Sequence, residues 1–301
     1  MPAHTLDRTP SLTPLLARGA LLSPLKRSAL NRPRPDADFP GTRLVLPGVR
    51  VDLARLAAYE RVCGFPVGDD SLPITYPHVL GFPLAMLLMT DRAFPLPLLG
   101  LVHTSVEITR HRLLTTNGAY ELSAYVEELA PHRRGTEASV RTEARKGGEL
   151  VWESRSTYLA RHRRALPAGA LPGAPGSPDS PGSAGEREAL PVVASWRLGG
   201  DVGRRYGAAS GDRNPIHVHP LTARLFGFRR AIAHGMWTAA RCLAAHGTPQ
   251  SALVRAEFRA PVLLPGTVEY GADGWGNFEL RGAGGRVHLR GEVRGAPLGV
   301  G

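Results

Sequence analysis

Cysteine is scarce in this chain of 301 residues, which contains only Cys63 and Cys242. Neither lies among residues with metal-ligand spacing, so we expect no metal site built on cysteine and no metal elsewhere in the chain. Both fall in segments that we predict to be apolar helices. We therefore expect two buried free thiols in a protein of a reducing compartment.

Long apolar runs are also missing. The first forty residues are rich in Pro, Arg and Leu, and the stretch LTPLLARGALLSPL is too interrupted to cross a membrane. No signal-peptide cleavage pattern follows it. We interpret residues 1–40 as an arm that is poorly ordered or packs on the surface, and we expect a soluble, cytoplasmic protein without a membrane partner.

Lysine is nearly absent, although lysine and arginine together number 37 against 26 acidic residues, a formal net charge of +11. The arginine bias is better explained by genomic composition than by function. A basic surface still favours an acidic cofactor such as coenzyme A, or an acidic acyl-carrier protein. Nucleic-acid binding competes with this interpretation, but the chain has neither zinc-ligand spacing nor a motif of interleaved aromatic and basic residues. We expect no nucleic-acid partner.

A segment of Pro, Gly, Ala and Ser divides the chain. Residues 166–184 read LPAGALPGAPGSPDSPGSA, which is typical of an extended linker. A chain of this length has room for two domains, each with its own core. We predict an N-terminal unit at 41–165, a linker at 166–189 and a C-terminal unit at 190–301.

The two units show the same order of predicted elements, which indicates an internal repeat. In the first, a strand region at 42–51, a helix at 51–65 and an apolar helix at 75–91, bent or started at Pro83, precede strands near 101–109, 120–126, 136–144 and 149–160. In the second, a strand near 195–201, a helix at 201–210 and an apolar helix from Gly235 precede strands near 254–260, 267–270, 277–280 and 287–293.

The residues best suited to chemistry lie in the motif Gly-Asp-x-Asn-Pro-x-His, residues 211–217. Pro215 lacks an N–H and biases Asn214 towards extended geometry, so we predict a tight, irregular loop rather than a helix through the motif. Such a loop can turn Asp212 and His217 towards one point. They are a candidate base and acid, or the reverse, for moving protons to and from one water. Asn214 is suited to a hydrogen bond that fixes the turn.

Gly235 opens the apolar segment MWTAARCLAAHG, which ends at Gly247 and is typical of a buried central helix. The first N–H groups of a helix have no intrahelical partner and carry partial positive charge. A glycine at this point lets a substrate oxygen approach the backbone. The Gly235 N–H is therefore a candidate oxyanion donor.

Taken together, residues 206–235 resemble the signature of the MaoC-like hydratases and dehydratases, which include the (R)-specific enoyl-CoA hydratases. The resemblance implies hotdog units, each an antiparallel sheet wrapped around one long helix, and hence an α+β double hotdog. It also implies that Asp212 and His217 bind and activate the water that adds across a 2-enoyl thioester. By the same resemblance, Gly235 donates its N–H to the thioester oxygen, with Asn214 beside it in the substrate-binding loop.

One position departs from the family pattern. An acidic residue usually follows two places after the catalytic histidine, and this chain has His219 there. The departure concerns the local hydrogen bond that the acid makes, and it leaves the Asp212 and His217 pair in place.

The N-terminal unit lacks a comparable pair. Asp212 and His217 precede His234 by 22 and 17 residues, and the residues that precede His78 by the same offsets are Leu56 and Arg61. Neither of these side chains can act as the acid or base of this reaction. We expect the first unit to keep the fold and, by analogy with the fold, to supply part of an acyl-binding tunnel. His78 is interpreted as a helix-start or buried structural histidine.

The expected activity is reversible hydration of trans-2-enoyl thioesters to (3R)-3-hydroxyacyl thioesters in fatty-acid or related lipid metabolism. It needs no cofactor beyond the coenzyme A or phosphopantetheine that the substrate carries, and an acyl-carrier protein and a second copy of the chain are candidate partners. Three alternatives are a hotdog thioesterase, a non-catalytic acyl-thioester-binding subunit and a nucleic-acid binder. The histidine five residues after the acid argues against the first, and His219 keeps the second open.

Overall fold

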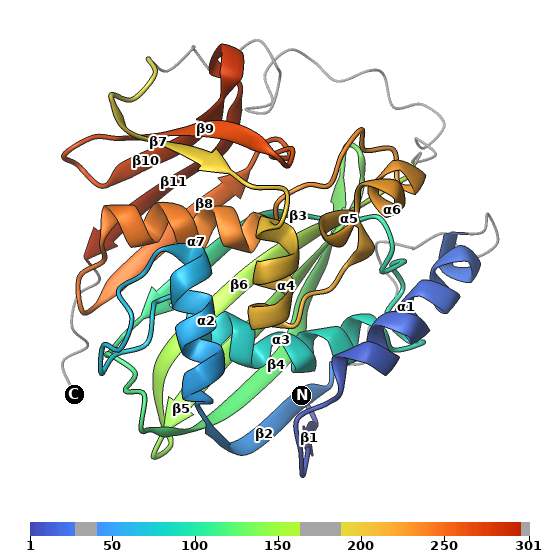
Figure 1. The fold of residues 1–301 in the computed structure, drawn as a ribbon. Helices are drawn as coiled ribbons and strands as arrows, with labels where there is room; N and C mark the ends of the chain where they lie inside the picture. The colour runs from blue at the N-terminus through green and yellow to red at the C-terminus, as the bar shows by residue number, and fades with distance from the viewer. Residues whose placement is uncertain (28–40, 163–187, 296–301) are drawn as a thin grey trace, which may run out of the picture.

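The computed structural model describes residues 1–27, 41–162 and 188–295, which contain eleven strands in a single sheet (Figure 1). The strands of the first half are β1 (Ala3–Thr5), β2 (Arg43–Arg50), β3 (Leu101–Arg110), β4 (Ala119–His132), β5 (Gly135–Lys146) and β6 (Glu149–Arg161). Those of the second half are β7 (Val192–Leu198), β8 (Ala252–Phe258), β9 (Gly266–Ala272), β10 (Asn277–Gly282) and β11 (Val287–Gly295). The helices are α1 (Leu12–Arg27), α2 (Leu53–Cys63), α3 (Tyr76–Met89), α4 (Val202–Ser210), α5 (Pro215–Val218), α6 (Pro220–Leu225) and α7 (Gly235–His246), with a 3₁₀ turn at Ala283–Gly285.

The strand order shows that the two halves repeat one topology. The sheet runs β1-β2-β4-β5-β6-β3-β8-β11-β10-β9-β7, and only β1 and β2 pair in parallel. Apart from β1, each half contributes five strands in the order first, third, fourth, fifth, second, counted from its outer edge. The halves meet where β3 pairs with β8 in antiparallel fashion. The predicted double hotdog of α+β class is confirmed.

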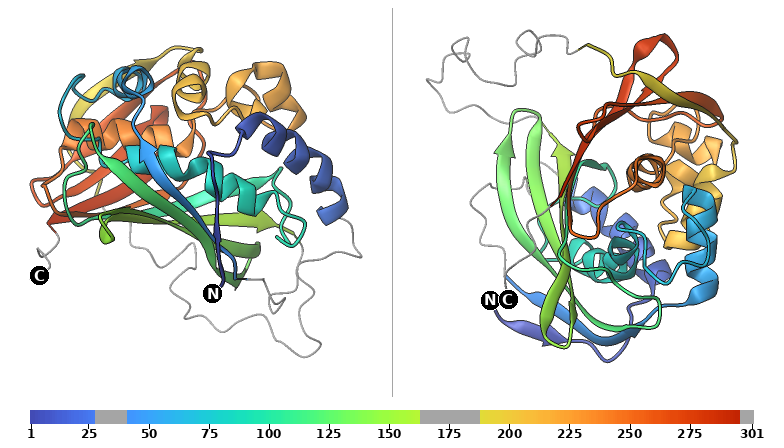
Figure 2. Two further views of the ribbon diagram at one scale, coloured as in Figure 1. Left: turned by 90° about the horizontal axis from the view of Figure 1, so that it is seen from below. Right: turned by 90° about the vertical axis from the view of Figure 1, so that its left-hand side faces the viewer.

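The sheet curves around the helices, which lie along its concave side (Figure 2). Nearly all of α3 is apolar and buried, as expected for a central helix, and it packs on β4 and β5 while α7 packs on β10. The backbone of α3 comes close to the sheet at Gly81, where an added Cβ would overlap the side chain of Thr142. One hydrophobic core joins both halves.

Helices α2 and α4 occupy equivalent places and contact each other. Tyr59 precedes the end of α2 at Gly64 by five residues, as Tyr206 precedes the end of α4 at Gly211. Both glycines adopt positive φ, 81° and 85°, and the two tyrosine rings lie 5.9 Å apart. The interface between the units is therefore built from matching positions of the repeat.

The second unit carries an insertion after this point. Twelve residues separate α2 from α3, whereas twenty-four separate α4 from α7, and the longer segment contains α5 and α6. A constant offset therefore fails, because Leu56 and Arg61 lie inside α2 and before Gly64. The equivalence predicted for these two residues is corrected: the first unit has a shorter connection where the second has the motif.

Residues 1–27 of the predicted arm pack against the first unit. Strand β1 extends the sheet edge along β2, and α1 packs against α3. The Ser23 hydroxyl accepts the Leu99 N–H at 2.9 Å, and Leu15 is buried. The rest of the predicted arm and nearly all of the predicted linker, residues 28–40 and 163–187, lie outside the described residues.

The remaining element predictions agree with the structure in most places. The apolar helix predicted at 75–91 is α3, which begins at Tyr76 and contains Pro83, so of the two alternatives a start at Pro83 is excluded. Cys63 and Cys242 are buried free thiols, as predicted. None of the helices in the described ranges is long and apolar enough to cross a membrane.

Candidate active site

The motif forms a tight turn that leads into one turn of helix. The chain leaves α4 at Gly211, and Asn214 then caps α5 with its side-chain oxygen, which accepts the Ile216 N–H at 3.4 Å. The expected absence of helix is wrong for residues 215–218. Pro215 occupies the first helical position, where the missing N–H has no intrahelical role, so proline starts this helix instead of preventing it.

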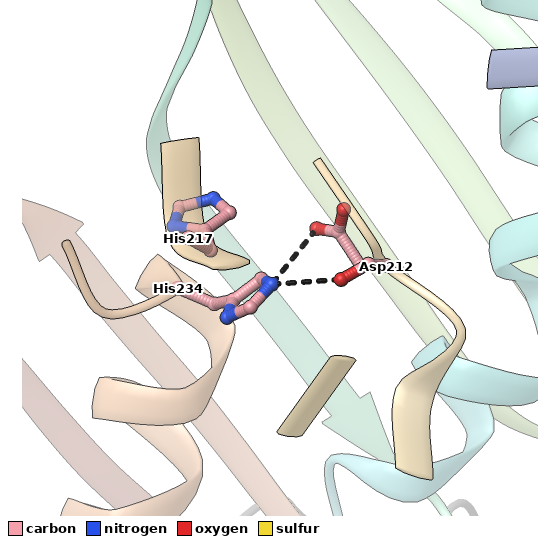
Figure 3. Close-up of side chains that lie close together, drawn as sticks. All are labelled: Asp212, His217 and His234. Atoms are coloured by element: carbon pink, nitrogen blue, oxygen red, sulfur yellow. Dashed lines mark hydrogen bonds and ion pairs between the residues drawn. The ribbon is translucent and has the colours of Figure 1, made fainter. Parts of the chain in front are cut away.

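Asp212 and His217 face the same place, together with His234 (Figure 3). Each of the three offers a side-chain atom, and these atoms lie within 4.8 Å of one another. The Asp212 side chain is 28% exposed, whereas His217 is 9% exposed. Asp212 Oδ1 accepts the Asn214 N–H at 3.2 Å, so Asn214 orients the carboxylate as well as the turn.

The tautomer of His217 follows from its partner. Its Nδ1 lies 2.8 Å from the carbonyl oxygen of Ile232, which can only accept, so Nδ1 carries the proton. The neutral ring then has Nε2 as its one proton acceptor. A base on this residue acts through Nε2.

His234 is a further site residue, which the sequence showed only as a reference point for the repeat. Its ring stacks on that of His217 with centroids 3.7 Å apart. Its Nε2 donates to the main-chain carbonyl of Asp212 at 2.9 Å and lies 3.9 Å from Oδ2 of the same residue. His234 therefore contacts both Asp212 and His217. Its position directly before Gly235 was the available signal.

Burial sets the protonation of the cluster. It lowers the pKa of His217 to about 3, with a further contribution from His234 that Asp212 opposes. It lowers the pKa of His234 to about 4. Burial also raises the pKa of Asp212, against the effects of His217 and the Asn214 N–H. Both imidazoles are therefore neutral at pH 7.

Gly235 is the first residue of α7, and within the described residues its N–H has no hydrogen-bond acceptor. A Cβ added at this position would lie 3.3 Å from the ring of Phe258. Glycine therefore leaves the helix N-terminus uncovered beside His234. This is the arrangement that an oxyanion donor requires.

The first unit also reaches this neighbourhood. The ring of Phe258 lies 4.9 Å from that of His103 on β3, which stacks on Tyr158 of β6 at 4.6 Å. Burial raises the pKa of Tyr158, and the charge of Asp212 adds to the effect. The sequence placed both residues in strands without marking them. His78 is buried in the first turn of α3, where the sequence placed it, and its ring centroid lies 6.3 Å from that of His103.

His219, the departure from the family pattern, caps α6. Its exposed ring accepts the Leu221 N–H through Nδ1 at 3.1 Å. An acidic side chain at the same position is equally suited to capping. The substitution therefore concerns the start of α6, and the Asp212 and His217 pair is intact.

Fold and site together define a double hotdog protein with an acid and an imidazole at the start of its second central helix. The MaoC-like domain family matches residues 198–274. The chain is 36% identical over 269 residues to 3-hydroxyacyl-thioester dehydratase X of Mycobacterium tuberculosis, covering 87% of this chain and 92% of that protein. The chain belongs to the MaoC-like family.

Solved structures agree with this assignment. The crystal structure of HtdX from Mycobacterium tuberculosis superposes with a TM-score of 0.71 at 33% identity, over 84% of this chain and 100% of that one. A MaoC-like dehydratase from Phytophthora capsici superposes with a TM-score of 0.66 over 89% and 100% of the two chains. At 17% identity, the latter speaks for the fold alone.

Proposed function

We propose that this protein catalyses the reversible hydration of trans-2-enoyl thioesters to (3R)-3-hydroxyacyl thioesters, through Asp212, His217 and the Gly235 N–H. The observation that carries the proposal is the meeting of a carboxylate and a neutral imidazole beside the uncovered N-terminus of α7. Membership of the MaoC-like family and the name of the mycobacterial relative support the reaction class.

In the hydration direction, the water oxygen attacks C3, one proton leaves the water and one proton is added at C2. One residue of the pair takes the water proton and the other, in its protonated form, gives a proton to C2, and transfer of one proton between Asp212 and His217 restores the pair for the next turnover. The hydrogen bond from Nδ1 to Ile232 supports His217 as the acceptor of the water proton, since Nε2 is the free acceptor of the ring. The negative charge that develops on the thioester oxygen is stabilised by the Gly235 N–H and by the partial charge of the helix end.

The proposed reaction uses no metal or redox cofactor. The three side chains could be taken for a metal site, but His217 and His234 stack face to face. In addition, Nδ1 of His217 and Nε2 of His234 are already bonded to the main-chain carbonyls of Ile232 and Asp212, so neither nitrogen is free to bind a metal ion. Coenzyme A or phosphopantetheine enters with the substrate. The two buried free thiols support a cytoplasmic location.

When the purified protein is added to crotonyl-CoA, the absorbance of the enoyl thioester should fall. Chiral chromatography should identify the product as the (3R)-3-hydroxybutyryl thioester. Release of free thiol in place of the hydroxyacyl thioester would instead make the protein a thioesterase. Binding of crotonyl-CoA without any product would make it a non-catalytic subunit.

A further inference from the structure

The segment around the catalytic pair is strongly basic. Between Val202 and Gln250 the sequence has seven arginines, and the carboxylate of Asp212 is its only acidic side chain. That carboxylate is partly exposed, and Arg213, the next residue in the chain, is exposed. A charge excess of this size beside a candidate site attracts anionic partners.

These arginines differ from those on the strands. On the sheet, Arg141, Arg155 and Arg255 each pair with two glutamates. Four arginines near the motif have no ion-pair partner within the described residues, and these are Arg213, Arg224, Arg229 and Arg230. Arg224 and Arg230 bond only to main-chain carbonyls, at 3.5 Å and 2.9 Å.

Two leucines among these arginines bury little of their surface. Leu221 is 61% exposed and Leu225 is 84% exposed, and they lie four positions apart in helix α6, which puts both on one face. Hydrogen bonds hold α6 to α5, which carries His217: the Thr222 hydroxyl donates to the Pro215 carbonyl at 2.6 Å. Exposed apolar side chains surrounded by charge mark surfaces of protein contact.

The insertion that carries these residues is specific to the second unit, where α5 and α6 lie between α4 and α7. We define the basic rim as the four unpaired arginines together with the two exposed leucines: Arg213, Arg224, Arg229, Arg230, Leu221 and Leu225. In the repeat, the first unit has neither the catalytic pair nor a counterpart of the rim. Catalytic residues and rim therefore belong to one added piece of chain.

We propose that the basic rim is the docking surface for a small acidic acyl-carrier protein, which presents the enoyl group to Asp212 and His217 on its phosphopantetheine. This inference rests on the proposed function and adds the identity of the carrier. The arginines match the negative charge of such a protein, and the leucines match an apolar patch on its surface. The phosphates of coenzyme A would use the arginines and leave the leucines bare, so the exposed leucines favour the protein.

The test compares three substrates with one acyl group: a crotonyl-loaded acyl-carrier protein, crotonyl-CoA and crotonyl-pantetheine. Two double variants alter the rim, Arg224→Glu with Arg229→Glu, and Leu221→Ala with Leu225→Ala. The matched control is Arg50→Glu with Arg61→Glu, which makes the same change of charge on two exposed arginines of the first unit that also have no ion-pair partner within the described residues. None of these residues belongs to the proposed catalytic machinery.

We expect KM for the loaded carrier protein to rise about tenfold in each rim variant, because complementary charge and apolar contact are both lost. The kcat/KM for crotonyl-pantetheine should stay unchanged, and the control should behave as the natural protein. An equal loss with crotonyl-CoA would assign the rim to nucleotide phosphates. An unchanged KM for the carrier would also overturn the proposal.

Direct binding separates this inference from the proposed function. The holo-carrier protein without an acyl group should bind the natural protein, and its Kd should rise about tenfold in the rim variants even if no hydration is seen. Binding unaffected by the variants would refute docking while leaving hydration to its own test. A smaller sedimentation coefficient of the leucine variant would show instead that the rim is an interface between copies of the chain. DNA binding that is sensitive to salt and is lost in the arginine variant would show instead that the rim is a nucleic-acid site.

Discussion

At the scale of single residues, the central feature is a carboxylate and an imidazole whose protonation is set by burial. The motif predicted Asp212 and His217, because a short turn with a proline can bring two side chains to one point. It did not show His234, whose contact with both depends on the chain returning after the insertion. His103 and Tyr158 were equally hidden, since their place beside Phe258 depends on the pairing of β3 with β8.

His234→Ala should lower kcat about tenfold or more with little change in KM, because the main-chain carbonyl of Asp212 loses its donor and His217 loses its stacking partner. Steady-state hydration of crotonyl-CoA measures the split. The control is His246→Ala, at the far end of the same helix, which should leave kcat unchanged. A kcat for His234→Ala equal to that of the natural protein would remove His234 from the site.

At the scale of elements, the N-terminus of α7 is the part of the fold that we propose to stabilise the substrate oxygen. Gly235→Ala places a methyl group 3.3 Å from Phe258, where the substrate oxygen is proposed to approach. We expect kcat/KM to fall by about 10² or more, the range seen when one oxyanion donor is lost. Phe258→Leu in the same chain should recover part of the loss by giving room. Full activity in Gly235→Ala would contradict the oxyanion role.

Helix α6 gives a prediction about the unusual His219. His219→Asp should keep activity and stability, because aspartate caps the Leu221 N–H equally well. His219→Ala should lower the free energy of unfolding by about 1 kcal/mol, measured in urea, with kcat close to that of the natural protein. A loss of kcat in His219→Ala with unchanged stability would give this residue a direct part in the reaction.

Helix α5, which begins at Pro215, shows why short helices are difficult to predict from sequence. Proline excludes a helix that runs through it but begins one readily, and the motif alone does not distinguish the two cases. The apolar helix from Gly235 was easier, since its composition and its closing glycine agree.

At the scale of the whole molecule, the order of elements predicted an internal repeat, and the resemblance of the motif to the MaoC-like family implied that each unit is a hotdog; the double hotdog is confirmed. The repeat could not be aligned by counting, because the second unit has twice as many residues between its two helices as the first. Only the shared Tyr and Gly at the ends of α2 and α4 give the true register. The insertion also explains why one unit alone has the motif.

Stability should fall in acid. Burial lowers the pKa of four histidines to about 3 or about 4, and these are His78, His103, His217 and His234. Below pH 6.5, the ordinary pKa of histidine, these side chains bind protons in the unfolded chain but stay neutral in the folded chain. Each histidine therefore lowers the free energy of unfolding by up to about 1.4 kcal/mol per pH unit. The raised pKa values of Glu60 and Asp212 act in the opposite sense and reduce the net slope.

Urea unfolding at about pH 7.5 and about pH 5.5 measures this dependence, with a lower free energy of unfolding expected at the lower pH. His78→Asn removes one of the four groups and should make the dependence shallower. Equal free energies of unfolding at both values would show that these histidines are not held neutral by the fold.

The central claim is that Asp212 and His217 together activate one water, and hydration of crotonyl-CoA by Asp212→Asn and His217→Ala tests it most directly. We predict that each substitution lowers kcat by about 10² to 10⁴, as for loss of a general acid or base, and that the double variant is little worse than either single one. Circular dichroism should confirm an unchanged fold. Turnover retained in either folded variant would contradict the claim.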